Sequence, residues 1–294
     1  MKKAILPAKS DLQYVSLVLP GLIIFTAGLI VPLIMGIGYS LTDWNGISQN
    51  KTFTGFLNYI RAFTDPEVRS AWLFTIKFTV VNTIIQNTLA LLLAVVLDGK
   101  IPGKKILRTI FFFPCLISAV IVGFVWTKMY NNVLPAVFDA MGLDGHLCML
   151  FGDEKTVLQG LLIANNWQWV GYWMLIYLAA LQSVPAELYE AARVDGANSV
   201  QRFRHVTIPM IASAITVCTV GITTGSLKVY DLLVTSTRGG PGRASTSIIY
   251  YIYSAAIGGR QYGFGSALSV VLTVVLLAVA VVQLRMLRKN EVQM

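Results

Sequence analysis

Six long windows of this chain contain no acidic or basic side chain, histidine aside. They are residues 12–42, 78–97, 109–127, 156–186, 205–227 and 261–284. A helix needs about 20 mostly apolar residues to cross the hydrocarbon core of a bilayer, within a usable range of roughly 17–25. Because lipid offers no hydrogen-bond partners to a backbone, spans of this length are helices. The windows therefore predict an integral membrane protein with six transmembrane helices.

The composition supports an all-α membrane fold. Hydrophobic residues make up 55% of the 294 residues, charged residues only 13%, and the mean hydropathy is +0.67. Ordinary soluble domains carry about 25% charged residues, and a membrane barrel would show short alternating segments instead of long apolar runs. We expect one transmembrane domain over residues 1–294. Its spans are expected at about 12–39, 70–97, 108–130, 156–183, 206–235 and 263–285.

Two apolar segments need separate comment. The first window contains Pro20 and Pro32, which predicts a kinked or tilted helix rather than two separate helices. A secretory signal would have a core of only about 7–15 apolar residues. The uncharged stretch 244–259 has 16 residues and follows RGGPGR at 238–243, which forbids regular structure. Since it is short for a span and rich in tyrosine, we expect a re-entrant or interfacial helix there.

Basic residues are distributed unevenly over the connecting segments. Residues 1–11, 98–108, 187–204 and 285–294 hold 13 lysines and arginines in 50 residues, whereas 43–69, 128–155 and 228–260 hold 9 in 88. The positive-inside rule assigns the denser set to the cytoplasm, together with both termini of a multi-pass membrane protein. The net charge of +9 then reflects topology. No basic cluster is interleaved with aromatic residues as nucleic-acid binding would require.

No residue pattern indicates an enzyme or a metal site. Cys115, Cys148 and Cys218 form no close pair, and the two histidines are too far apart in sequence for a metal motif. The string nearest to a phosphate-binding loop, residues 99–104, has the wrong spacing and no following Ser or Thr. We expect no metal, no bound cofactor and no catalysis in this chain.

The polar segment between the fourth and fifth windows reads PAELYEAARVDGANSVQRFRHVTIP, residues 185–209. Pro185 suits the first position of a helix, and small side chains follow at helical spacing. Gly196 suits a left-handed C-terminal cap, and Asn198 or Ser199 suits the start of a second short helix. We expect a helix, a turn and a helix outside the membrane. Such an element serves a docking role and a position on lipid headgroups equally well.

The order of residues in this segment decides between the two roles. Glu190-Ala191-Ala192, then Gly196, then Ile208-Pro209 resembles the EAA signature of the membrane subunits of binding-protein-dependent ABC importers. The resemblance extends over residues about 14–285 and is closest to the carbohydrate branch of the family. The strings that carry it are Phe56-Leu57-Asn58-Tyr59, Thr64-Asp65-Pro66, Ile76-Lys77-Phe78-Thr79, Pro114 and Ser118 with Gly123 and Trp126, Trp169-Val170-Gly171, Ile176-Tyr177-Leu178 with Leu181-Gln182, Pro185-Ala186-Glu187-Leu188-Tyr189, Gly239-Gly240-Pro241 and Tyr251-Ile252-Tyr253.

The resemblance implies a MetI-like importer permease fold. The chain is similar to the first, maltose-permease-like partner of a permease pair, in the six-helix form that lacks the extra N-terminal helices and large outside domain of that protein. The EAA segment is then a coupling helix in a groove of a cytoplasmic ATPase subunit. The residues assigned to coupling are Glu190 as polar anchor, Ala191 and Ala192 as close contacts, Gly196 as the bend, Asp195 and Arg193 as partner contacts or solvated charges, and Pro209 at the start of the next span. Gly196→Asp is expected to leave insertion intact and to uncouple ATP hydrolysis from transport.

Charged residues inside the spans mark a candidate pathway, because a charge at a helix centre costs about 2.5–3.5 kcal/mol on insertion scales. Lys77 and Lys128 lie near span ends and can snorkel. Lys228 and Asp231 are expected to share one helical face and to neutralise each other. The fourth span combines amides and large rings, which suits either a sugar or an interfacial aromatic belt. These residues are Asn165, Asn166, Trp167, Gln168, Trp169 and Tyr172.

In the family the substrate path is lined by the spans that correspond to the fourth to sixth here. The positions that match are Val170, Gly171, Tyr172, Ser226, Lys228, Val229 and Asp231. By this resemblance we expect one transmembrane subunit, in the bacterial cell membrane, of an ATP-driven importer for a carbohydrate, in particular a di- or oligosaccharide. The resemblance implies a second homologous permease, two cytoplasmic ATPases that bind ATP and Mg, and an extracytoplasmic solute-binding protein.

Two alternatives remain at this point. A polyol or glycerol-phosphate importer of the same class would let Lys228 face an anion. A secondary transporter driven by an ion gradient would need a titratable or ion-coordinating core, for which Asp231 alone offers a candidate.

Overall fold

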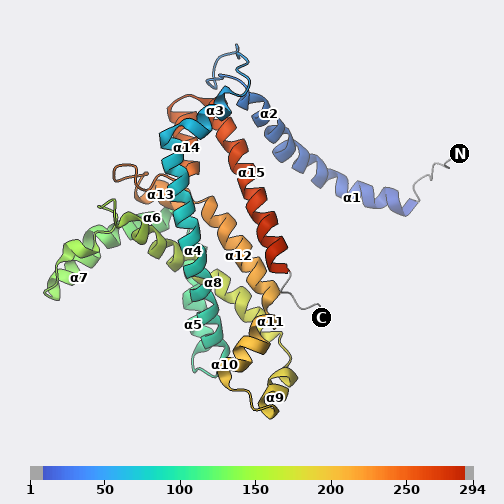
Figure 1. The fold of residues 1–294 in the computed structure, drawn as a ribbon, viewed down its shortest axis with the longest axis vertical. Coiled ribbons are helices and arrows are strands. Elements are labelled where there is room, and N and C mark those ends of the chain that lie inside the picture. Colours follow the sequence, from blue (N-terminus) through green and yellow to red (C-terminus); the bar gives the residue numbers. More distant parts are fainter. Residues whose placement is uncertain (1–8, 289–294) are drawn as a thin grey trace. The chain divides into compact units, whose positions relative to one another are not determined.

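The computed structural model describes residues 9–288, in which every regular element is a helix (Figure 1). The chain forms two compact units. One combines the chain up to Thr64 with Ile252–Leu272, and the other combines Asp65–Tyr251 with the chain from Thr273 onward. The expectation of a single transmembrane domain concerns both units together and stays a prediction, as does the location of the two termini, whose residues 1–8 and 289–294 lie outside the described part.

The first unit begins with a long apolar helix that contains two prolines. Its parts are α1 (Lys9–Phe25), a π-helical segment (Thr26–Ile30) and α2 (Val31–Ser40). The helix is continuous through both prolines, as the sequence predicts. Its segment Leu17–Ser40 is long and apolar enough to cross a membrane as one span. A short amphipathic helix, α3 (Leu57–Thr64), follows the loop after α2. Tyr59 of α3 hydrogen-bonds Ser40 at 2.7 Å, which ties α3 to the end of the first span.

Three π-helical segments of the chain each end two residues before a proline. Proline has no N–H and its ring collides with the carbonyl group four residues earlier, so a regular turn is disfavoured there. A wider π turn, with the hydrogen bond reaching back five residues, accommodates the ring without ending the helix. These segments are Thr26–Ile30 before Pro32, Met129–Val133 before Pro135 and Phe203–Thr207 before Pro209.

The second unit contains most of the remaining helices. Its elements are α4 (Pro66–Asp98), α5 (Lys104–Phe112), a 3-10 turn (Phe113–Leu116), α6 (Ala119–Lys128), the π segment Met129–Val133, α7 (Leu134–Ala140), a second 3-10 turn (Gly145–Cys148), α8 (Val157–Gln182), α9 (Ala186–Val194), α10 (Ser199–Arg202), the π segment Phe203–Thr207, α11 (Ile208–Met210), α12 (Ala212–Leu227) and α13 (Asp231–Ser236). Three elements follow: α14 (Ile248–Tyr253), the π segment Ser254–Gly258 and α15 (Tyr262–Leu287). The chain passes from the second unit to the first within α14 and returns to the second unit within α15.

Length and composition identify three continuous spans among residues 9–288: Leu17–Ser40, Pro66–Asp98 and Tyr262–Leu287. Two further pairs of helices are long and apolar enough for a span only when both members are counted together, and each pair is bent at a short break. They are Lys104–Leu116 with Ala119–Ala140, and Ser199–Met210 with Ala212–Leu227. The total is thus three spans, or five if each pair crosses once. Helix α8 has 26 residues, about 39 Å at 1.5 Å per residue, and is not among these spans. A crossing by α8, and with it the count of six, stays a prediction.

The third predicted span, 108–130, is not one straight helix. Its two halves meet at an angle of 101°. Pro114 lacks an N–H, and Ile117 and Ser118 adopt extended backbone with ψ of 135° and 136°. The break leaves the Ile117 carbonyl group without a helical partner, and Gln168 of α8 donates a hydrogen bond to it at 3.0 Å. A tertiary hydrogen bond therefore stabilises a bend that the uncharged window does not reveal.

The fifth predicted span, 206–235, also differs. It bends by 70° at Ile211 and ends at Leu227 rather than near residue 235. Lys228 and Tyr230 leave the helical conformation, and α13 starts afresh at Asp231. Ser247 donates its hydroxyl to the Val229 carbonyl at 2.8 Å, which satisfies the backbone at this break. The 11-residue helix Ile248–Gly258 is shorter than a span, which agrees with the expected re-entrant or interfacial segment.

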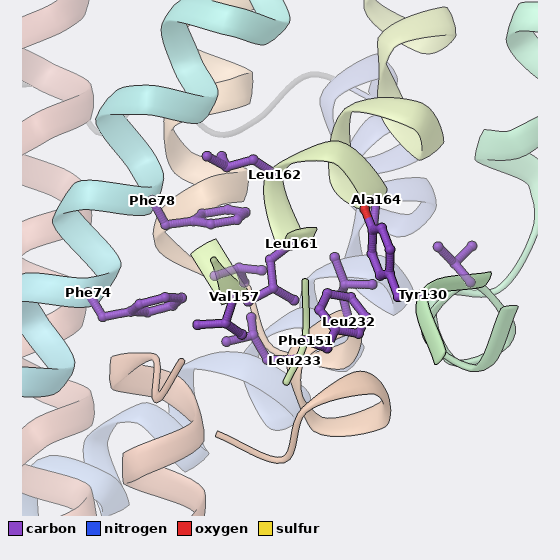
Figure 2. Close-up of a cluster of buried hydrophobic side chains, with 12 residues drawn as sticks. Phe74, Phe78, Tyr130, Phe151, Val157, Leu161, Leu162, Ala164, Leu232 and Leu233 are labelled. Atoms are coloured by element: carbon purple, nitrogen blue, oxygen red, sulfur yellow. The ribbon is translucent and has the colours of Figure 1, made fainter. Parts of the chain in front are cut away.

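Two apolar clusters form the core of the second unit. In the first, Phe74 and Phe78 of α4 point toward Val157 and Leu161 of α8 (Figure 2). This cluster also contains Tyr130, Phe151, Leu162, Ala164, Val229, Leu232, Leu233 and Val122. The second cluster joins the later halves of α4 and α8 to α12. Its members are Ala90, Ala94, Leu97, Val170, Met174, Tyr177, Leu178, Leu181, Ile211, Ala214, Cys218 and Ile222. The same two helices, α4 and α8, therefore run through both clusters.

Candidate functional site

A layer of buried amides separates the two apolar clusters. On α4 the buried residues Phe74, Phe78, Asn82, Gln86, Ala90 and Ala94 recur every four residues and so form one stripe. The two amides stand in the middle of that stripe, and Asn82 is the central residue of the 33-residue helix. On α8, Asn165, Asn166 and Gln168 occupy the corresponding place between the clusters. Because buried polar groups in membrane spans are costly, this layer is the first candidate for function.

A cavity of about 250 Å³ opens at this layer. Helices α4, α8 and α12 and the break before α13 supply its walls. It is lined by Asn82, Gln86, Ala119, Asn165, Gln168, Trp169, Trp173, Gly221, Ile222, Gly225, Ser226, Lys228, Val229, Tyr230, Asp231 and Leu232. The wall thus combines amide and hydroxyl groups with the faces of large aromatic rings, and two charged side chains stand at the helix break.

Asn82 links the three helices around the cavity. Its amide nitrogen donates to Ser226 Oγ of α12 at 2.8 Å and to Gln86 Oε1 at 3.1 Å. Its carbonyl oxygen accepts hydrogen bonds from Asn165 at 3.1 Å and Asn166 at 3.0 Å, both on α8. All the hydrogen-bonding capacity of this side chain is used, since an amide offers two donors and two acceptor lone pairs. Asn82 therefore holds the cavity wall together.

A second set of hydrogen bonds follows Asn82 toward the C-terminal end of α4. Thr83 and Thr223 of α12 are joined at 3.3 Å, and Gln283 of α15 donates to Thr223 at 2.9 Å. Tyr177 of α8 donates to Asn87 at 2.7 Å. Polar contacts therefore connect α4 directly to α8 and α12, and α12 to α15 through Thr223, which fixes the rotation of these helices about their axes.

The structure brings some of the expected pathway residues together and separates others. Ser226, Lys228, Val229 and Asp231 all line the cavity. Val170, Gly171 and Tyr172 do not. Val170 belongs to the second apolar cluster, a Cβ on Gly171 would overlap the Phe111 carbonyl oxygen, and the Tyr172 ring packs edge-on against Trp173 at 4.9 Å between ring centroids. From α8 the cavity receives Asn165, Gln168, Trp169 and Trp173 instead.

The expected neutralisation of Lys228 by Asp231 does not occur. The expectation assumed one helix through both residues, but α12 ends at Leu227 and α13 begins at Asp231. No ion pair joins the two side chains in the described part of the chain, and both are exposed. They nevertheless line the same cavity. Lys77 and Lys128 are exposed and lie outside the lining, in line with the snorkelling interpretation.

Asn82 and Gln86 were not predicted as site residues from the sequence. Both lie inside an uncharged window, where a search for charges passes over amides. The four-residue stripe on α4 was the available signal, because it continues through Asn82 and Gln86 with the same spacing as the buried apolar residues.

The segment 185–209 folds as the sequence predicts. Helix α9 ends in a Schellman motif: the Gly196 N–H donates to the Arg193 carbonyl at 3.0 Å and the Ala197 N–H donates to the Ala192 carbonyl at 2.9 Å. Gly196 has φ of +76°, the left-handed conformation that favours glycine. Asn198 then caps α10 in a capping box with Gln201. Pro185 stands one position earlier than expected, as the N-cap of α9.

This helix–turn–helix is open to solvent. No residue of α9 is buried, and the apolar side chains of Val194 and Val200 are 88% and 74% exposed. Glu190, Ala191, Asp195 and Gly196 are also exposed, whereas Ala192 and Pro209 are half-buried. The hydroxyl groups of Tyr189 and Thr207 are 3.0 Å apart, which links α9 to the π segment before Pro209. In Figure 1 α9 lies beyond the ends of the other helices of the second unit.

Comparison with known proteins identifies the family. Residues 86–289 match the family described as binding-protein-dependent transport system inner membrane component. The chain is 35% identical, over 97% of each chain, to the probable starch degradation products transport system permease protein AmyD of Thermoanaerobacterium thermosulfurigenes. It is 31% identical to the multiple sugar-binding transport system permease protein MsmF of Streptococcus mutans serotype c, over 89% of this chain and 90% of that protein.

A solved structure has the same fold. The crystal structure of a bacterial ABC transporter involved in the import of the acidic polysaccharide alginate matches 96% of both chains with a TM-score of 0.83 and 24% identity. These findings confirm the resemblance inferred from the EAA segment. They exclude the secondary-transporter alternative, because members of this family are the non-enzymatic membrane subunits of ABC importers. The chain belongs to the inner-membrane components of binding-protein-dependent transport systems and is a permease subunit.

Proposed function

We propose that this permease carries a di- or oligosaccharide through the cavity at the centre of α4. The observation that supports the proposal is the composition of the cavity wall. Sugar rings present C–H faces that stack on aromatic side chains and hydroxyl groups that need paired donors and acceptors. Trp169 and Trp173 supply the rings, and Asn165 and Ser226 supply polar groups. The relatives named for starch degradation products and multiple sugars point the same way.

The volume of the cavity suits part of an oligosaccharide. Sites for drug-sized ligands measure about 300–1,000 Å³, and this cavity has about 250 Å³. The remaining surface of the solute would face a second, homologous permease subunit across a shared pathway. A weak central site is what alternating access requires, because the solute must enter from one side and leave to the other.

The exposed helix–turn–helix of residues 185–209 is proposed to dock on a cytoplasmic ATPase subunit. Val194 and Val200 present apolar side chains to solvent, and Glu190 forms no ion pair within the described residues. An exposed helix with apolar and unpaired acidic groups fits a groove on a protein partner. Two ATPases that bind ATP and Mg would drive the permease pair, and an extracytoplasmic binding protein would deliver the solute.

A polyol or glycerol-phosphate importer is the second candidate, and Lys228 is the observation in its favour. This cation lines the cavity without an ion pair to Asp231. A phosphorylated solute would gain from it, whereas a neutral sugar would not.

The test is uptake into proteoliposomes that contain this chain, its second permease and its ATPases, with the binding protein outside. We expect ATP-dependent uptake of maltotriose that excess glycerol 3-phosphate does not inhibit. ATP-dependent uptake of glycerol 3-phosphate that excess maltotriose does not inhibit would favour the anionic solute. Replacing Lys228 with Gln gives the matched control, because it should leave sugar uptake nearly unchanged and should abolish uptake of an anion.

A further inference from the structure

Gln86 lines the cavity, and the NH₂ group of its side chain has no hydrogen-bond partner among the described residues. Its side chain is 2% exposed, and its carbonyl oxygen accepts from Asn82 at 3.1 Å. Buried amides are nearly always paired, and one that is not needs a specific explanation. The position of Gln86 in the cavity wall supplies one.

The orientation of this amide is fixed by Asn82. Both amide hydrogens of Asn82 are committed, one to Gln86 Oε1 and one to Ser226 Oγ. If the oxygen and nitrogen of the Gln86 amide exchanged places, the Gln86 NH₂ group would face the NH₂ group of Asn82, and two donors would oppose each other. The hydrogen-bond network therefore holds Gln86 Oε1 toward Asn82. The Gln86 NH₂ group is thereby left as the free donor, and Asn82 is the positioning residue.

An oxygen acceptor is what an unpaired NH₂ group needs. We propose that Gln86 donates a hydrogen bond to a hydroxyl oxygen of the solute during translocation. This inference rests on the proposed function and adds α4 to the solute-contacting helices. The ring faces of Trp169 and Trp173 line the same cavity and would bind the apolar faces of a sugar ring. Gln86 then discriminates hydroxylated solutes from those of similar shape that lack an acceptor.

A purely structural origin of the unpaired donor is the competing explanation, and Thr79 provides the control for it. Thr79 lies seven residues earlier on the same face of α4, is 5% exposed, and has a hydroxyl group without a partner. It does not line the cavity. Removing either unpaired group should change the stability of the protein similarly. A difference between the two positions in labelling or in solute uptake therefore indicates a role of Gln86 in the pathway.

The first experiment requires no knowledge of the solute. In a chain with Cys115, Cys148 and Cys218 replaced by Ala, Gln86→Cys and Thr79→Cys are assembled with the second permease and the ATPases in proteoliposomes. A small water-soluble methanethiosulfonate is added during ATP turnover. We expect Gln86→Cys to react and Thr79→Cys to stay unmodified. Equal reactivity of the two cysteines, or no reaction at position 86, would overturn the inference.

The second experiment measures transport of maltotriose by Gln86→Met and Thr79→Val. Both substitutions keep the volume nearly constant and remove the unpaired group. Gln86→Met also removes the carbonyl oxygen that accepts from Asn82, so thermal unfolding of both variants is measured beside uptake, and uptake is compared at equal amounts of folded transporter. Loss of one neutral hydrogen bond to the solute predicts about a three- to tenfold fall in uptake for Gln86→Met, with Thr79→Val close to the native chain. Native-like uptake by Gln86→Met, or an equal loss in Thr79→Val, would contradict it. If the native transporter carries no maltotriose, the proposed substrate fails while the labelling result still decides the position of Gln86.

Discussion

Replacing Gly196 by Ala should weaken docking of the ATPase subunit by a predictable amount. Gly196 closes the Schellman motif of α9 with φ of +76°, and a Cβ at this position would meet no atom within 4 Å. The cost is therefore purely a backbone cost, roughly 1–2 kcal/mol for an L-residue in the left-handed region. If only the bent conformation docks, and if the bend is marginally stable in the free protein, the apparent affinity falls with the population of that conformation, by up to a factor of about 5–30.

Gly103 gives a matched control on another segment assigned to the cytoplasm. It caps α5 with φ of +75°, and its Cβ position is equally open. Gly103→Ala should therefore cost the same backbone energy without touching the docking element. Gly196→Asn should lie between native and Ala, since asparagine tolerates the left-handed conformation better than most residues.

The assay is titration of the purified cognate ATPase subunit onto the permease pair in nanodiscs, with each variant in turn. Thermal unfolding of the same samples shows whether the two Ala variants lose similar stability. An affinity of Gly196→Ala within twofold of native would refute the proposed need for the bend. An equal loss in Gly103→Ala would show that the effect is general destabilisation.

Three further outcomes are expected. Tyr189→Phe removes the hydrogen bond to Thr207 and should cost about 0.5–1.5 kcal/mol in thermal unfolding; a Tyr189→Phe/Thr207→Val double variant should lose little more than either single one. Gly171→Ala should lower stability by about 1–3 kcal/mol because its Cβ would overlap the Phe111 carbonyl group of α5, whereas Gly225→Ala, with open space, should not. Tags on both termini should be accessible to protease in inside-out vesicles and protected in right-side-out ones; accessibility on opposite faces would contradict an even number of spans.

Local signals allowed the coupling segment to be predicted nearly residue by residue. Gly196, Asn198 and Pro209 each have a strong backbone or capping preference, so the helix, turn and helix follow from nearest neighbours. The bounds of α4, α8 and α15 were predicted to within a few residues for a similar reason, because long apolar windows end at charges. The functional assignment of the segment came from residue order and is not a property of its geometry.

The breaks inside the spans could not be predicted in the same way. Ile117 and Val229 carry ordinary apolar side chains, and their carbonyl groups are satisfied by Gln168 and Ser247 from distant segments. Such breaks depend on tertiary hydrogen bonds, which no window of sequence contains. Pro114 was the one local warning. For the same reason, Lys228 and Asp231 were assigned to a helix face that the structure does not form.

The connection between the docking segment and the cavity is short and regular. Helix α8 carries the cavity residues Trp169 and Trp173 and ends at Gln182, and α9 begins at Ala186 after three residues. From Trp173 to the end of α8 is nine residues, about 14 Å of continuous helix. Because α8 is also hydrogen-bonded to Asn82, any displacement of α8 changes the amide layer and its contacts with α12. A movement imposed on α9 by an ATPase would thus reach the solute through one helix, without a separate relay of side chains.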